Sequence, residues 1–131
     1  MGVTVTVRDE TRPGSASSTL TLDDVPAAIT LRDLIRTRVR EEVARANADP
    51  RGELRTLVEP VDAERTLNGY RLREPRRVDW KQQADVALEA FGRNGFFVLV
   101  GGRQVADLDQ ELDLDADTDI RFVKLTPLVG G

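Results

Sequence analysis

The stretch Phe96–Val105, with the sequence FFVLVGGRQV, carries the strongest structural signal in the chain. Its first half, Phe96–Val100, is entirely apolar and predicts a buried strand. Gly101-Gly102 then predicts a tight turn, and Arg103-Gln104-Val105 starts the partner strand. We therefore predict that the last third of the chain is built around a β-hairpin.

An acidic segment and a final strand follow this hairpin. Asp107–Asp119 predicts an acidic loop that also carries three leucines. Its stretch Glu111–Asp119 (ELDLDADTD) lacks the glycine and the terminal glutamate of a calcium-binding EF-hand loop, so no metal site is predicted there. Ile120–Leu125 predicts the last strand, and we expect residues 126–131 to form a short flexible tail.

A first hairpin and a helix precede the middle of the chain. Val3–Val7 alternates between valine and threonine, which is typical of a half-buried strand, and Thr19–Leu22 resumes the alternation after a polar loop. Thr30, with Asp33 three residues later, predicts the start of a helix, which Asp49-Pro50 stops. One apolar stripe at helical spacing predicts the buried face of this helix: Leu31, Leu34, Ile35, Val39, Val43 and Ala46.

The segment 50–94 is the hardest part of the chain to interpret. Asp79 predicts the start of a second helix, whose apolar stripe begins with Trp80. We expect this single tryptophan to anchor a core rather than to form a platform for a ligand. Leu54–Val58 fits either a short strand or a loop, and Asn68-Gly69 predicts a turn.

The order of these elements predicts an α+β fold in which a mixed sheet packs on one helix. We interpret residues 1–131 as a single domain, with residues 50–94 as an insertion that carries the second helix. The favoured role of the insertion is to cover the open face of the sheet. The alternative is that it docks a partner protein.

The composition argues against catalytic chemistry. The chain has 131 residues and neither cysteine nor histidine, which removes thiol nucleophiles, disulfides, the usual zinc sites and imidazole acid–base catalysis. The serines have no obvious base beside them, and the carboxylates are scattered over solvated stretches. We therefore predict no enzyme activity, no catalytic residue and no cofactor.

The net charge and the hydropathy pattern argue against nucleic-acid and membrane partners. A net charge of -4 and a pI near 4.9 argue against a nucleic-acid partner. Apolar runs are short and the N-terminus lacks the pattern of a secretory signal, so we expect a cytoplasmic protein without a membrane partner. Arg36, Arg38 and Arg40 leave an acidic partner open, but a solvated helix face is the favoured interpretation.

The C-terminal part of the chain resembles the C-terminal half of ubiquitin. In that family an apolar strand turns at a small-Gly pair into a basic-Gln-apolar triplet, and Val98–Val105 has this pattern. An acidic residue and then a leucine follow, here Asp107 and Leu112, before a last strand and a tail that ends in Gly130-Gly131. Residues 1–47 match only in pattern, and residues 50–94 have no counterpart.

The resemblance implies a ubiquitin-like β-grasp protein whose working end is Gly130-Gly131. An activating enzyme would adenylate the carboxylate of Gly131 with ATP. The acyl group would then pass to a thiol, and later to an amine or to sulfur. Glycines without Cβ atoms suit a tail that threads a narrow catalytic channel.

The resemblance also implies which residues bind partners. Leu128 corresponds to the tail leucine that ubiquitin uses for docking. Leu99, with Leu125 beside it, corresponds to the exposed apolar patch by which ubiquitin is recognised. Pro127 and Val129 replace two basic residues of the ubiquitin tail, which implies a dedicated activating enzyme.

Three functions remain open from the sequence. The favoured one is a protein modifier, bacterial in view of the arginine-rich composition, with an activating enzyme, a conjugating enzyme, a deconjugating protease and protein targets as partners. Such bacterial proteins often act beside activating and conjugating enzymes, sometimes in antiviral defence. The second is a sulfur carrier, resembling those of molybdopterin and thiamine synthesis, that forms a thiocarboxylate on Gly131. The third is a β-grasp interaction module whose final glycines have no chemical role.

Overall fold

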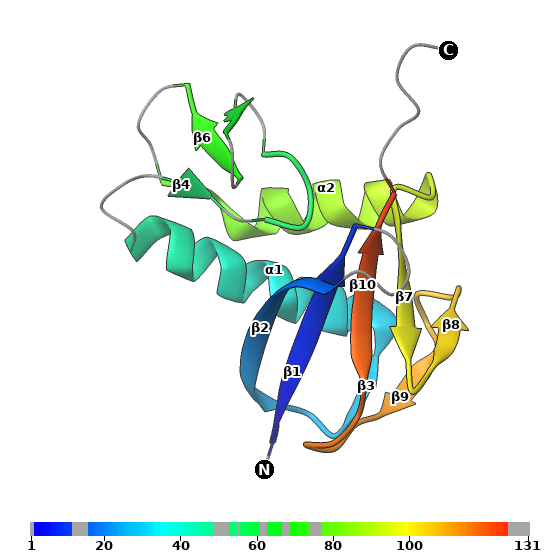
Figure 1. Cartoon of the computed structure of the whole chain (residues 1–131). Coiled ribbons are helices and arrows are strands. Elements are labelled where there is room, and N and C mark those ends of the chain that lie inside the picture. Colours follow the sequence, from blue (N-terminus) through cyan, green and yellow to red (C-terminus); the bar gives the residue numbers. More distant parts are fainter. Residues whose placement is uncertain are drawn as a thin grey trace. The chain divides into compact units, whose positions relative to one another are not determined.

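The computed structural model describes residues 2–11, 16–48, 53–54, 56–60, 63–66, 69–73 and 77–125, which form an α+β fold (Figure 1). In chain order the elements of this part are β1 (Val3–Glu10), β2 (Ala16–Val25), β3 (Ala28–Thr30), α1 (Leu31–Ala48), β4 (Glu53–Leu54), β5 (Ala63–Arg65), β6 (Tyr70–Leu72), α2 (Trp80–Gly92), β7 (Phe96–Val100), β8 (Arg103–Val105), β9 (Glu111–Asp113) and β10 (Ile120–Lys124). Neither of the helices described here has the length and hydropathy to cross a membrane.

Contacts divide the chain into two units. Met1–Leu34 together with Ala90–Gly131 forms the first, and Ile35–Glu89 forms the second. The α+β prediction is confirmed. The interpretation of residues 1–131 as a single domain with an insertion at 50–94 stays a prediction.

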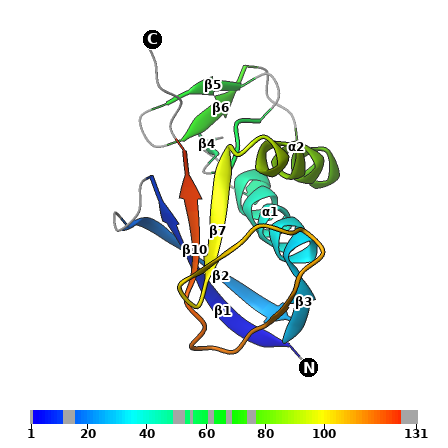
Figure 2. The ribbon, with the colours of Figure 1, turned by 90° about the vertical axis from the view of Figure 1, so that its right-hand side faces the viewer.

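A mixed sheet of five strands organises the first unit. Its order is β2-β1-β10-β7-β8, with β1 parallel to β10 and the other neighbouring strands antiparallel (Figure 1, Figure 2). Val7 lies opposite Ile120, which in turn lies opposite Val100. The first and last strands therefore lie side by side at the centre of the sheet, with β2 on one side of the pair and the β7–β8 hairpin on the other.

Side-chain alternation separates a core face of this sheet from an outer face. Val5 and Val7 of β1 are buried on the core face, which confirms the predicted half-buried strand. The ring centroid of Phe96 lies 5.6 Å from that of Phe91 and 6.0 Å from that of Phe122. Apolar residues of the other strands complete this core: Leu22, Val98, Val105 and Ile120. Their burial is the main force that holds the first unit together.

The acidic segment contains a strand that the sequence-based prediction missed. β9 pairs antiparallel with β3, and Leu112 lies opposite Ile29. Both of these side chains are buried, whereas Glu111 and Asp113 on either side of Leu112 are exposed. Because this alternation has the period of a strand, the prediction of a continuous loop over Asp107–Asp119 is wrong for β9.

The acidic segment also supplies hydrogen-bond acceptors for the first N–H groups of α1. Thr30 caps the helix as predicted, since its Oγ1 accepts a hydrogen bond from the N–H of Asp33 at 3.2 Å. The next two N–H groups find partners in the acidic segment. Leu31 donates to the carbonyl of Gln110 at 3.0 Å, and Arg32 donates to that of Leu108 at 2.9 Å.

Aspartates of the acidic segment form local turns. The carboxylate of Asp107 accepts a hydrogen bond from the N–H of Asp109 at 2.9 Å, and that of Asp115 accepts one from Asp117 at 2.8 Å. Such Asx turns use the acidic side chains to shape the backbone. Within the described residues, no group of three or more acidic side chains is placed to hold a metal ion.

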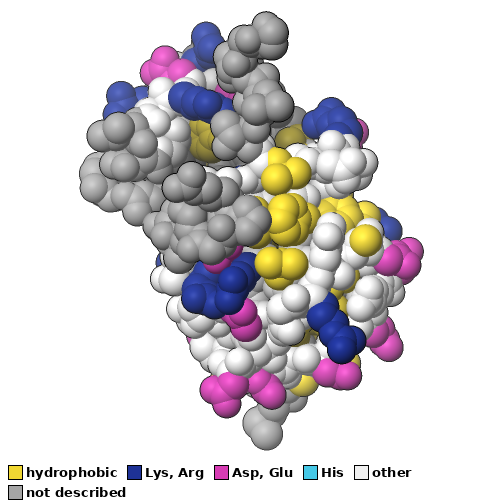
Figure 3. All heavy atoms as spheres, turned by 45° about the vertical axis from the view of Figure 1, so that its right-hand side comes forward, with side chains coloured by type: hydrophobic (Ala, Val, Ile, Leu, Met, Phe, Trp, Pro, Cys, Tyr) yellow, Lys and Arg dark blue, Asp and Glu magenta, His cyan; other side chains and the backbone are white. Residues whose placement is uncertain are grey.

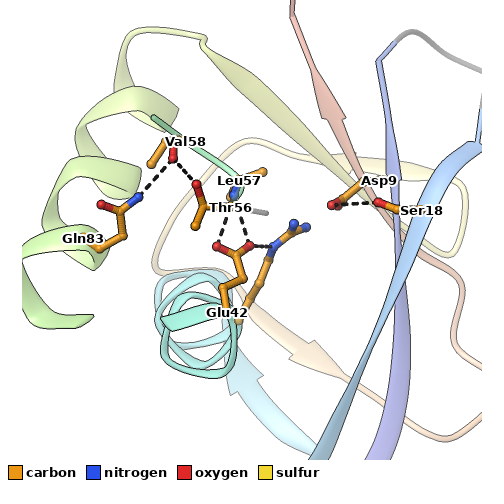
Figure 4. A network of polar contacts seen from close by, with 8 residues as sticks. Asp9, Ser18, Glu42, Thr56, Leu57, Val58 and Gln83 are labelled. Carbon is orange, nitrogen blue, oxygen red and sulfur yellow. Dashed lines mark hydrogen bonds and ion pairs between the residues drawn. The ribbon is translucent and has the colours of Figure 1, made fainter. Parts of the chain in front are cut away.

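A buried ion pair lies inside the second unit (Figure 4). Nε of Arg38 lies 2.5 Å from Oε1 of Glu42, one turn further along α1, and each side chain is 2% exposed. The N–H of Leu57 donates to both carboxylate oxygens at 3.1 Å. The prediction that Arg38 belongs to a solvated face is therefore wrong, because Glu42 balances its charge in the interior. Arg36 and Arg40 are exposed, as predicted.

Further hydrogen bonds connect the two helices to the segments between them. The carbonyl of Val58 accepts from Oγ1 of Thr56 at 2.6 Å and from Nε2 of Gln83 in α2 at 3.0 Å (Figure 4). Asn47 donates to the carbonyl of Val78 at 3.2 Å and accepts from its N–H at 2.9 Å. Polar side chains therefore help to fix the arrangement of the second unit, in addition to the apolar stripe of α1.

Local predictions for the insertion are met in part. Asp79 caps α2, since its Oδ1 accepts from the N–H of Lys81 at 3.0 Å. Glu53–Leu54 is a strand, in a small sheet of order β4-β6-β5, whereas residues 56–58 are irregular. The predicted turn at Asn68-Gly69 lies partly outside the described residues.

The role of Trp80 as a core anchor stays a prediction. Its side chain is half-buried, and the guanidinium carbon of Arg40 lies 5.6 Å from the ring centroid. The buried positions of α2 are taken by Gln83, Ala84 and Ala87 instead. Trp80 opens α2 and is followed by the exposed Lys81, so part of its ring remains accessible.

We predict that Glu42→Gln lowers the free energy of unfolding by about 3–5 kcal/mol, because it removes the carboxylate charge that is paired with the buried Arg38 guanidinium group. Glu41→Gln is the matched control, since Glu41 forms an exposed pair with Arg45 at 2.9 Å. The Glu41→Gln control should lower the free energy of unfolding by less than about 1 kcal/mol. Urea unfolding followed by circular dichroism measures both, and equal losses would contradict the structural role of the buried pair.

Candidate partner-binding surface

The β7–β8 hairpin turns through two glycines. Gly101 has φ 60° and Gly102 has φ 81°, and Val100 pairs with Arg103 across the turn. A two-residue turn with positive φ at both central positions matches the twist of the flanking strands. The N–H of Gly101 also donates to the carbonyl of Asp119 at 2.8 Å. The predicted tight turn is confirmed, and it sets which residues of β7 face outward.

Leu99 lies on the outer face of the sheet. Phe96 and Val98 are buried. Phe97, which lies between them, and Leu99, which follows Val98, are half-buried. Leu99 is opposite Gln104 of β8 on one side and Arg121 of β10 on the other. The partner-binding prediction for Leu99 is therefore compatible with its accessible position in the structure.

Leu125 is the one large hydrophobic residue of the described chain that is classed as exposed, at 44%. Its N–H donates to the carbonyl of Gly95 at 3.1 Å, which continues the pairing of β10 with β7. Two residues earlier, Val123 lies opposite Phe97. Because side chains two residues apart share a face of a strand, Leu125 lies on the same face as Phe97 and Leu99.

Leu99 and Leu125 share this face but are not neighbours. Leu99 is four residues from Gly95, the partner of Leu125, which corresponds to roughly 13 Å along the strand. Phe97 lies between them and belongs to the same surface, although the sequence analysis did not single it out. Figure 3 shows hydrophobic side chains gathered on the side of the molecule where Figure 1 places β7. We call Phe97, Leu99 and Leu125 the apolar surface.

A charged cluster adjoins this surface on the same face. Nη2 of Arg8 lies 2.6 Å from Oδ1 of Asp119, and Nε of Arg121 lies 2.9 Å from Oδ2 of Asp119. Arg121 also approaches Glu10 at 3.7 Å, and the Glu10 side chain is 2% exposed. Arg121 pairs with Leu99 in the sheet register, so the charged cluster begins where the apolar surface ends.

The cluster shifts the titration of its members. The hydrogen bond from Arg8 holds the pKa of the Asp119 carboxyl below its usual range, and the charge of Arg121 adds to this effect. In return, the hydrogen bond to Asp119 raises the pKa of Arg8. A carboxylate that accepts hydrogen bonds from two guanidinium groups remains ionised further into the acid range.

The remaining predicted site residues lie outside the part of the chain that is described. These are Pro127, Leu128, Gly130 and Gly131. The described chain stops at Leu125, six residues before Gly131 in the sequence. The structure therefore places two predicted partner-binding residues, Leu99 and Leu125, and adds Phe97 to them.

No protein-family model, curated protein or solved structure matches the chain. The fold and this surface define an α+β protein with a mixed five-stranded sheet and an accessible apolar surface beside a charged cluster.

A pair of glycine substitutions tests the geometry of the hairpin. Gly102→Ala should lower the free energy of unfolding by about 1–2 kcal/mol, because a Cβ atom at positive φ is strained even where space is open. Gly92→Ala should instead raise it by about 0.5–1 kcal/mol, because Gly92 ends α2 and a Cβ there meets nothing within 4 Å. Thermal unfolding of both variants measures the difference, and shifts of the same sign would contradict the turn.

The charged cluster predicts a pH dependence. Asp119 has a lowered pKa in the folded protein, so its contribution to stability is fully present above the ordinary aspartate pKa of about 4 and is lost as the pH falls through the folded value. The stability lost in Asp119→Asn should therefore be largest near neutral pH and vanish in acid. Asp113→Asn is the control, since Asp113 is exposed and forms no ion pair with another described residue. Urea unfolding across this pH range measures both, and a pH-independent loss for Asp119→Asn would refute the assignment.

Proposed function

We propose that the chain is a ubiquitin-like β-grasp protein modifier, activated at Gly131 by an ATP-dependent adenylating enzyme and conjugated to target proteins. The observation that carries this proposal is the sheet order β2-β1-β10-β7-β8 with its parallel β1–β10 pair. A parallel pair that joins the first hairpin to the last strand, with a second hairpin beside that strand and a helix after the first hairpin, is the arrangement expected of a β-grasp. The Gly101-Gly102 hairpin that carries the sequence resemblance to ubiquitin lies within this arrangement.

The chemistry of the proposal requires only a carboxylate that another protein can reach. The carboxylate of Gly131 attacks the α-phosphate of ATP and releases pyrophosphate. A thiol of the enzyme then displaces AMP, and an amine of the target displaces the thiol. Six residues beyond Leu125 span at most roughly 20 Å when extended, which suits delivery of this carboxylate into a separate active site.

The apolar surface supports the recognition step. Phe97, Leu99 and Leu125 are accessible on one face, and Leu125 is the last described residue before Pro127 and Leu128. An enzyme that binds the tail would therefore meet apolar side chains on the sheet directly beside it. Such a surface is a common protein-binding feature, because covering it removes apolar area from water.

The product of conjugation predicts a specific mass-spectrometric signature. Trypsin cleaves after Lys124, so a modified target lysine should carry the remnant Leu125–Gly131 (LTPLVGG) on its side chain. We expect this remnant when the chain is co-expressed with the adenylating and conjugating enzymes encoded near its gene. A chain from which Gly131 is deleted should give no remnant, although its circular-dichroism spectrum is unchanged.

Other outcomes of the same experiment decide against the modifier. Replacement of one oxygen by sulfur on the free protein, without adducts, would identify a sulfur carrier. The absence of both, together with equal behaviour of the deletion, would leave a non-conjugated binding module. The intact mass of the free protein from cells shows whether Gly131 is its last residue or is exposed by a deconjugating protease.

The apolar surface predicts a separate effect on the enzyme step. Leu125→Arg should reduce the rate of ATP-dependent thioester formation about tenfold or more, since it places a charge where apolar contact is expected. Its stability should change by no more than about 0.5 kcal/mol, because Leu125 is already exposed. Thr21→Arg, on an exposed position of β2, is the control and should keep the normal rate. Equal rates in both variants would remove the apolar surface from the recognition step.

A further inference from the structure

Two arginines of α1 lack an ion-pair partner among the described residues. Arg36 and Arg40 are exposed and one helical turn apart, so their Cβ atoms are separated by about 6 Å. Other arginines in this part of the helix are paired, since Arg38 binds Glu42 and Arg45 binds a neighbouring glutamate. The two free guanidinium groups are therefore not part of the charge balance within α1.

An aromatic ring lies beside the second of these arginines. The guanidinium carbon of Arg40 is 5.6 Å from the ring centroid of Trp80, which is only half-buried, and Lys81 follows as an exposed residue. The contact with the ring orders the guanidinium group and leaves its N–H donors available for an acceptor. We call Arg36, Arg40, Trp80 and Lys81 the basic face. Its arginines suit carboxylates, which guanidinium groups bind in a forked geometry.

The first unit presents carboxylates with a similar spacing. Glu111 and Asp113 are exposed on β9, on the same side of the strand and about 6–7 Å apart, with the buried Leu112 between them. Neither carboxylate has an ion pair with another described residue. Nearby, Asp109 is bound by Arg32 at 3.2 Å, so a carboxylate of this segment already binds an arginine of α1.

We propose that the basic face of one copy binds the Glu111–Asp113 edge of a second copy. Two guanidinium groups about one helical turn apart match two carboxylates on alternate strand positions in both sign and spacing. The contact joins different surfaces on the two copies, so it is head-to-tail and permits growth beyond a dimer. It does not depend on the proposed conjugation.

The expected association is weak and sensitive to salt. Exposed ion pairs contribute at most about 1 kcal/mol each, so cover of the accessible part of the Trp80 ring supplies the remainder of the roughly 4 kcal/mol that a dissociation constant on the order of 1 mM at low salt requires. Salt at about 0.5 M should abolish it by screening. Trp80 is the only tryptophan, so its fluorescence reports directly on the basic face. Quenching by acrylamide should decrease as the protein concentration rises, while sedimentation shows species larger than the monomer.

Charge reversal tests the contact from both sides. Arg36→Glu/Arg40→Glu and, separately, Glu111→Lys/Asp113→Lys should each abolish self-association at low salt. A chain with all four changes keeps the net charge of -4 and should recover it, because the two surfaces are exchanged. Arg65→Glu/Arg73→Glu is the matched control, as both arginines are exposed in the second unit and should be dispensable. Circular dichroism establishes that each variant is folded, and the two single-surface variants test the contact independently.

Several results would overturn the proposal. The first is a wild-type protein that remains monomeric to about 1 mM at low salt. The second is association that survives either charge reversal, or that the control abolishes equally. The third is protection of Trp80 from quenching by a single-stranded oligonucleotide, at protein concentrations where the protein alone is monomeric. This result would assign the basic face to phosphate groups.

Discussion

The parallel pairing of β1 with β10 is the contact on which the first unit depends. It joins residues near the start of the chain to residues near its end, from Val7 opposite Ile120 to Glu10 opposite Val123. β2 pairs with β1 on one side, and the β7–β8 hairpin pairs with β10 on the other. The core face and the outer face of the whole sheet are therefore defined only when β1 and β10 pair. Because the pairing closes a long loop, its entropic cost is offset only by the apolar contacts that it creates.

The second unit is organised by a different kind of interaction. The carboxylate of Glu42 accepts hydrogen bonds from Arg38 and from the backbone of Leu57, and Gln83 binds the carbonyl of Val58 next to it. A buried charge is costly unless its partners are in place, so these contacts favour one arrangement of the chain around α1 over looser alternatives. The apolar stripe of α1 alone would tolerate several such arrangements.

Features encoded within a few residues could be predicted from the sequence. Thr30 and Asp79 cap helices, and Gly101-Gly102 turns a hairpin, because each acts on its immediate neighbours. The buried state of Arg38 could not be predicted, since a glutamate four residues away is equally compatible with an exposed pair. Phe97 could have been added to the apolar surface from strand alternation. The link between Arg8 and Asp119 depends on the parallel pairing, which no local pattern reveals.

Recognition in such a protein depends on which side chains the fold leaves without a partner. On the outer face of the sheet, Arg8, Asp119 and Arg121 satisfy one another. Of the apolar side chains next to them, Val123 is fully buried, Phe97 and Leu99 are half-buried and Leu125 is exposed. In the second unit, the paired charges of Arg38 and Glu42 are buried. Arg36 and Arg40, which form no ion pair with a described residue, are exposed. Hydrogen bonds between Asn47 of α1 and the backbone of Val78 fix the chain just before α2, and Trp80 at the start of α2 lies against Arg40. A partner of opposite charge would therefore meet at least one guanidinium group that is already ordered, which lowers the entropic cost of binding.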